Sequence, residues 1–177
     1  MTYSIEDFDA VLNRARPITL STPASTLRQW RVELVRASVF ISYAIGVLSL
    51  DIEILHQSIV STSENVLQSL VDDLPGILAA GWVGGGWSLS PDASVSVGAA
   101  AELAADQADS LLELHREMVT SDLGDPTLVR DLLSRIEEQR ESLALRRAQL
   151  EDRIRQIQHI VREQYAVGGA SVDDWLD

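Results

Sequence analysis

The sequence predicts an all-α protein: a helical bundle with a long C-terminal coiled-coil helix and a Gly/Trp-rich insertion. Three observations lead to this fold class. An uncharged apolar run, Ala37–Leu50, lies within a helical pattern, a heptad pattern extends from Pro126 to Ala166, and capping residues precede both segments. At 177 residues the chain is long enough to bury a core without disulfides, and it contains no cysteine.

The central helix is predicted over Thr22–Leu55. Thr22 is placed to act as N-cap, and Pro23 at the first helical position lacks only a donor that would have no partner there. A helix that is apolar nearly all round is buried or lies in a membrane. Because the uncharged run of 14 residues is shorter than the roughly 20 that span a bilayer, we expect a core helix and no membrane span. Its apolar positions recur at steps of three and four: Leu27, Trp30, Leu34, Ile41, Ile45, Leu48, Ile52 and Leu55.

The N-terminal segment, residues 1–21, predicts a short amphipathic helix over Ser4–Arg16 that ends at Pro17. Such a helix either packs on its own bundle or docks into a neighbouring molecule, and the pattern leaves both open. Residues 22–125 form the predicted bundle core.

Within that core, residues 81–98 carry five glycines and two tryptophans, and we predict a loop or a short β-hairpin. Trp82 and Trp87 either anchor a protein partner or fold back over the end of the bundle. A helix follows over Ala99–Val119, and Asp125-Pro126 repeats the pattern of a capping residue before proline.

The last helix, residues 126–166, would be about 60 Å long at 1.5 Å per residue. Heptad reading places Arg140 and Arg147 on the apolar seam, which indicates selected register, selected oligomeric state or pairing with acids of another segment. The alternative is an ordinary bundle helix whose arginines extend to the surface. Besides these two arginines, the candidate partner-binding residues of this helix are Ile136, Leu143, Leu150, Ile154, Ile157 and Val161.

The acidic tail, residues 167–177, begins with glycines and ends with acids around Trp175 and Leu176. This composition is typical of a docking peptide for a basic, apolar groove, and also of a frayed or self-packing terminus.

The net charge of −13 is concentrated in one segment, since residues 51–125 hold thirteen acids against one arginine. This distribution disfavours nucleic-acid binding. All 14 basic residues are arginine, which excludes lysine Schiff bases and P-loops and is typical of high-GC bacteria, such as actinobacteria, and their phages. The N-terminus lacks signal-peptide features, so we expect synthesis in the cytoplasm, with the final location open.

Glu53 and His56 have the i, i+3 spacing of iron ligands in di-iron bundles. Those sites need a second such pair and two further glutamates, so a helix-surface pair is the preferred interpretation, and a small metal-binding bundle the least favoured alternative. Nucleophile elbows, zinc-protease and dinucleotide motifs are absent from the sequence. We therefore predict a non-enzyme with no cofactor, metal or catalytic residue.

The segment Trp82-Val83-Gly84 lies between two helical arms, Thr22–Ala80 and Ala99–Val119. In this respect the chain resembles the helical hairpins of the WXG-type family, which type VII systems secrete. The resemblance implies an antiparallel helical dimer that leaves the cell as a substrate or adaptor.

The sequence as a whole favours a non-enzymatic assembly or adaptor subunit, or a structural one, that acts through protein contacts in a phage or bacterial machine. Its expected partners are proteins, as a homo-oligomer or a multi-subunit assembly. The secreted hairpin of the preceding paragraph is the alternative.

Overall fold

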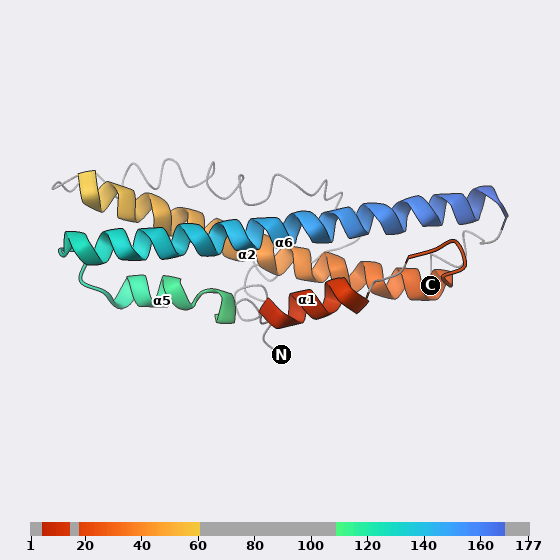
Figure 1. The fold of residues 1–177 in the computed structure, drawn as a ribbon, viewed down its shortest axis with the longest axis horizontal. Coiled ribbons are helices and arrows are strands. Elements are labelled where there is room, and N and C mark those ends of the chain that lie inside the picture. The colour runs from red at the N-terminus through yellow and green to blue at the C-terminus, as the bar shows by residue number, and fades with distance from the viewer. Residues whose placement is uncertain (1–4, 15–17, 61–108, 169–177) are drawn as a thin grey trace, which may run out of the picture. The chain divides into compact units, whose positions relative to one another are not determined.

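The computed structural model describes residues 5–14, 18–60 and 109–168, and this part of the chain is helical nearly throughout (Figure 1). It contains no strand, so the all-α prediction is confirmed for these residues. The predicted insertion at residues 81–98 and the tail after residue 168 lie outside them. The elements in chain order are α1 (Ile5–Arg14), α2 (Ala24–Val60), the 3₁₀ turn η1 (Asp109–Leu111), α5 (Glu113–Thr120) and α6 (Pro126–Ala166).

Helix α2 begins one residue later than the predicted capping position implies. Its first backbone hydrogen bond runs from Leu27 N–H to the Pro23 carbonyl, 3.0 Å. The Thr22 hydroxyl accepts the N–H of Thr19 at 3.1 Å, within the turn that precedes the helix. At its other end α2 continues to Val60, past the predicted end at Leu55.

Helix α6 has the predicted bounds, Pro126–Ala166. The Asp125 carboxylate accepts the N–H of Thr127 at 2.8 Å, which is the N-cap hydrogen bond, and Val129 N–H bonds the Asp125 carbonyl at 3.0 Å. In the preceding turn, the Asp122 carboxylate accepts the Gly124 N–H at 2.9 Å.

The predicted helix over Ala99–Val119 is interrupted in its described part. Leu112 lies between η1 and α5 with φ −114° and ψ 23°, outside the helical region. The Leu111 carbonyl accepts a hydrogen bond from the Gln139 side chain at 2.9 Å. Leu111 and Leu112 are both buried, so the break places two consecutive leucines in the core while a side chain of α6 satisfies the freed carbonyl.

The chain divides into two compact units. Of the described residues, the first unit contains 40–60 and 109–145, and the second contains 5–14, 18–39 and 146–168. The segment boundaries predicted from sequence stay a prediction.

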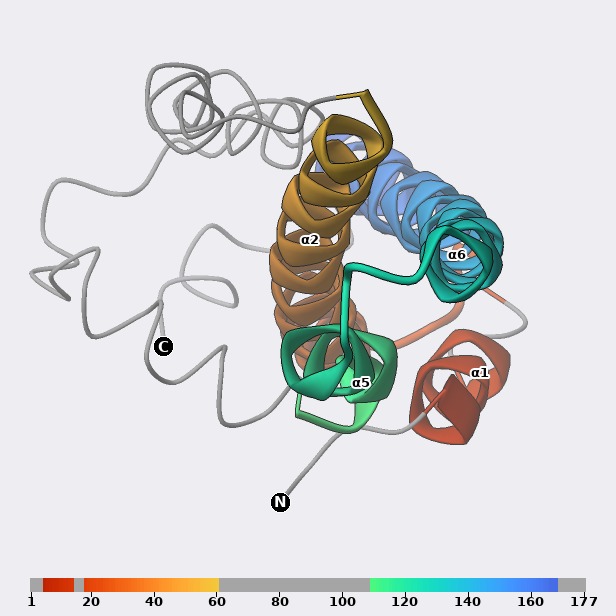
Figure 2. The ribbon, with the colours of Figure 1, turned by 90° about the vertical axis from the view of Figure 1, so that its left-hand side faces the viewer.

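In the first unit, the C-terminal part of α2, helix α5 and the N-terminal part of α6 lie side by side, as the end-on view shows (Figure 2). All three helices contribute buried apolar side chains to this unit. Its buried apolar residues are Phe40, Ile41, Ala44, Ile45, Leu48, Ile52, Leu55, Leu111, Leu112, Met118, Val129, Leu132, Ile136 and Leu143.

In the second unit, α1 lies beside the N-terminal part of α2 and the C-terminal part of α6 (Figures 1 and 2). The segment before α2 is held by Gln164 of α6, whose amide donates to the carbonyls of Leu20 and Thr22 at 2.9 and 2.7 Å. The buried apolar residues of this unit are Phe8, Val11, Leu12, Leu27, Leu34, Ala37, Leu150 and Ile157.

Helix α2 is also long and apolar enough, by length and composition alone, to cross a membrane over Ala24–Ile59. Its most apolar window has a mean hydropathy of 1.7, and 56% of that window is buried inside the protein. The core helix of a soluble protein has the same properties, so the expected absence of a membrane span stays a prediction.

Candidate functional site

Helix α6 carries two rows of heptad-spaced side chains, and the structure places them differently. The first row, here called the inner row, is completely buried within the chain itself: Val129, Ile136, Leu143, Leu150 and Ile157 have exposed fractions of 0 to 2%. Four of these, all except Val129, are predicted partner-binding residues. In the described protein they belong to the cores of the two units.

The second row of α6, here called the outer row, is only partly covered. Its five members are half-buried: Leu133, Arg140, Arg147, Ile154 and Val161. The Arg147 guanidinium contacts Glu151 of the same helix at 3.6 Å. The outer row therefore combines apolar side chains with two arginines on the part of the heptad seam that the chain's own core leaves partly open.

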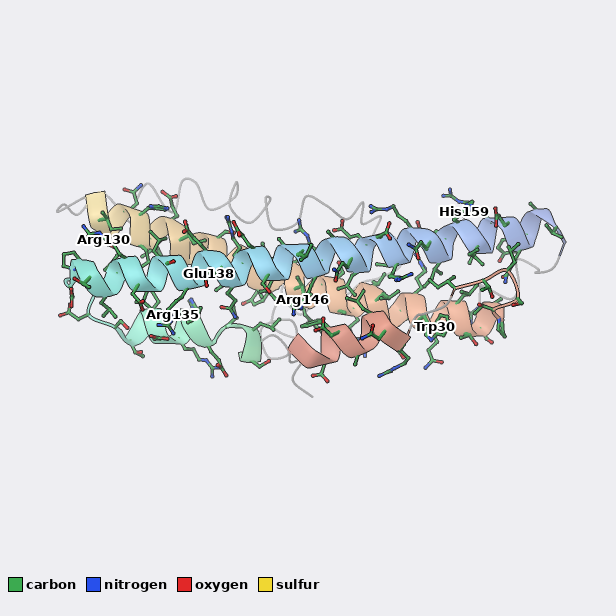
Figure 3. All side chains as sticks on the ribbon, viewed as in Figure 1. Trp30, Arg130, Arg135, Glu138, Arg146 and His159 are labelled. Atoms are coloured by element: carbon green, nitrogen blue, oxygen red, sulfur yellow. The ribbon has the colours of Figure 1, made fainter. Side chains whose placement is uncertain are left out.

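Among the described acids of the 51–125 segment, Glu117 pairs with an arginine of α6. Its partner is Arg135, labelled in Figure 3, which is not one of the two seam arginines. Both guanidinium amino groups of Arg135 donate to Glu117, each at 2.7 Å. These hydrogen bonds lower the pKa of Glu117 and raise that of Arg135. Since both side chains are about two-fifths exposed, solvent screens the pair, and its contribution to the stability of the fold is small.

A second tie of α5 is buried, and it connects this helix with α2. Nδ1 of His115 lies 2.9 and 3.0 Å from the two carboxylate oxygens of Asp51. Asp51 is fully buried, whereas the His115 side chain is 35% exposed. Burial raises the pKa of Asp51, and the hydrogen bond and charge of His115 act in the opposite direction.

The Asp51–His115 pair was not predicted from the sequence, although the sequence contains a signal for it. Ala37, Ala44 and Asp51 follow one another at intervals of seven, and all three are fully buried. The acid thus occupies a core position of α2, the most apolar of the described helices. His115, 64 residues away, has no local pattern that would identify it as the partner.

Glu53 and His56, the pair considered for metal binding, have separate partners. Glu53 accepts the side-chain amide of Gln57 at 3.0 Å, and Nε2 of His56 lies 3.9 Å from Glu137. Among the described residues, no group of three or more histidine, aspartate or glutamate side chains could hold a metal ion.

The remaining candidate residues, Trp82, Trp87, Trp175 and Leu176, lie outside the described residues. Their roles as partner anchors stay predictions, as does the resemblance to WXG-type proteins, which depends on Trp82 and Gly84.

Comparison with known proteins gives no relative from which a role could be transferred. No protein-family description, curated protein or solved structure matches the chain.

Proposed function

We propose that the chain is a non-enzymatic assembly or adaptor subunit that binds a protein helix along the outer row of α6. The observation that carries this proposal is the contrast between the two heptad rows of one 41-residue helix. The inner row is used by the chain's own core, whereas the outer row, with half-buried apolar residues and arginines, is the part of the predicted seam that the core covers only partly.

The composition of the outer row indicates the chemistry of its partner. Leu133, Ile154 and Val161 would pack against apolar side chains, whereas Arg140 and Arg147 would select acids beside them. A second copy of the chain meets this requirement, because its net charge of −13 supplies acids in excess. Self-assembly is therefore the first form of the proposal to test.

The test is the solution mass of the full chain by light scattering, measured across protein concentration and salt. We expect a defined oligomer that dissociates when Arg140→Glu reverses a charge in the first unit, or when Ile154→Asp places a charge among the apolar residues of the second. Arg130→Glu is the matched control. This substitution makes the same charge change as Arg140→Glu, but at an exposed position of α6 outside the outer row.

Point variants are preferable to removal of α6, because the inner row of this helix is part of both cores. A monomeric mass at every concentration for the unaltered chain would rule out self-assembly through the outer row. Equal dissociation by the Arg130 control would show that overall charge, and not this row, determines the oligomeric state.

A further inference from the structure

Helix α5 is too short to hold its place by its own stability. It has eight residues, fewer than the roughly 12–15 that an isolated helix needs in water, and Met118 is its buried residue. Its position in the first unit therefore depends on contacts to α2 and α6. One contact to α2 is the Asp51–His115 pair, which joins residues 64 positions apart.

Asp51 lies at a core position. Burying its carboxylate costs desolvation free energy, which an apolar residue at the same position would not incur. Asp51 continues the fully buried row of Ala37 and Ala44, and it is the one charged side chain that is buried among the residues the structure describes. Replacing buried ion pairs by apolar residues is often neutral or stabilising, whereas removing one partner alone destabilises strongly. A buried polar pair of this kind is best explained by specificity: it favours one packing arrangement of the helices over the alternatives.

We propose that the Asp51–His115 pair is a specificity device, which determines that α5, in one register, docks beside α2 in the first unit. An apolar residue at position 51 would accept any amphipathic helix, including one from a second copy of the chain. The buried carboxylate rejects these helices, because only a segment that presents a hydrogen-bond donor at this point satisfies both of its oxygens.

The geometry supports the selection of one register. Nδ1 of His115 lies almost equally far from both carboxylate oxygens of Asp51, 2.9 and 3.0 Å. A shift of α5 by one residue along its axis moves the imidazole by about 1.5 Å and turns it by about 100° around the helix, which breaks both contacts. Apolar packing around Met118 has no comparable directionality.

The inference does not depend on the proposed function of the outer row, since it concerns α2 and α5 of the same chain. It is tested in the full chain with the double variant Asp51→Leu/His115→Leu. Three quantities are measured for each protein: the urea midpoint of unfolding, the hydrogen exchange of the α5 amides relative to those of α6, and the mass by light scattering.

We expect the double variant to unfold at the same or a higher urea midpoint than the unaltered chain. Its α5 amides should nevertheless exchange at least about tenfold faster, or its mass should become mixed, because α5 no longer has a unique docking site. The matched control is Glu117→Leu/Arg135→Leu, which removes the exposed tie of the same helix and should leave both α5 exchange and mass unchanged.

Two results would overturn the proposal. Unchanged α5 exchange and unchanged mass in the double variant would show that the pair selects nothing, and a lowered midpoint would show that its role is stability. If the leucine pair precipitates, Asp51→Ala/His115→Leu gives the same decision, because alanine at position 51 continues the row of Ala37 and Ala44.

Discussion

The two short helices, α1 in the second unit and α5 in the first, are held by different kinds of contact. Helix α1 buries Phe8, Val11 and Leu12, and its ion pairs, to Glu33 and Arg146, are partly exposed to solvent. Helix α5 buries Met118 and is tied by a buried carboxylate–imidazole pair and a bidentate arginine. Apolar burial gives affinity without direction, whereas a buried polar contact such as Asp51–His115 is directional and favours one register. The comparison predicts that the two helices respond to different substitutions.

The largest effect is expected for Phe8→Ala in α1. Phe8 is fully buried, so its truncation removes transfer energy and leaves a cavity, at a cost of about 3–5 kcal/mol. Urea unfolding measures this loss. Asn13→Ala, at an exposed position of the same helix, is the control and should change little. A loss below about 1 kcal/mol for Phe8→Ala would mean that α1 contributes little packing energy.

A smaller effect is expected for Gln139→Ala, which acts on the break before α5. The Gln139 amide donates to the buried Leu111 carbonyl at 2.9 Å, while its own Oε1 is buried without a partner. Losing the hydrogen bond destabilises the fold, whereas removing the unpaired oxygen stabilises it. We expect the first effect to be larger and the free energy of unfolding to fall by about 1 kcal/mol. The exposed Gln149 provides the control variant Gln149→Ala. Higher stability of Gln139→Ala would show that the unpaired oxygen dominates.

A still smaller effect is expected for Asp9→Ala, which removes a partly exposed ion pair of α1. Nε of Arg146 lies 3.3 Å from the Asp9 carboxylate, which is half exposed. Such a pair contributes about 0–1 kcal/mol and weakens as salt is added. Urea unfolding at low and high salt measures the difference. A cost that exceeds this range or persists in high salt would mean that α1 also depends on a directional contact.

The sequence predicted the long elements of the fold and failed at its long-range polar contacts. The bounds of α6 follow from local chemistry, since the Asp125-Pro126 start and the heptad pattern need no knowledge of the rest of the chain. The break at Leu112 could not be predicted in this way, because the freed carbonyl of the preceding Leu111 is satisfied by Gln139, 28 residues further along the chain.

For the candidate site, too, the sequence predicted local patterns but not long-range contacts. Periodicity identified both rows of α6, but which row faces the chain's own core depends on where α2 and the short helices pack. Asp51 could be recognised as a charge at a core position, whereas its partner His115 could be found only from the structure, because the pair is 64 residues apart.

The last prediction concerns how stability varies with pH, and it separates the two ties of α5. Burial raises the pKa of Asp51, so the native state holds this proton more tightly than the unfolded chain does. The Asp51 contribution to stability is therefore fully present below the ordinary aspartate pKa, about 3.9, and is lost as the pH rises through the raised value. Asp51→Asn keeps an oxygen that accepts a hydrogen bond but cannot ionise.

The stability of Asp51→Asn relative to the unaltered chain should therefore increase across that pH interval and then level off. Glu117→Gln should give the opposite sign, because Arg135 lowers the pKa of Glu117 and its small contribution is lost as the pH falls. Urea unfolding in steps of pH, carried out below the range in which histidines titrate, measures both differences. A pH-independent difference for Asp51→Asn would mean that the buried carboxylate is no harder to ionise in the folded protein than in the unfolded chain, and would remove the electrostatic part of the contrast between α5 and α1.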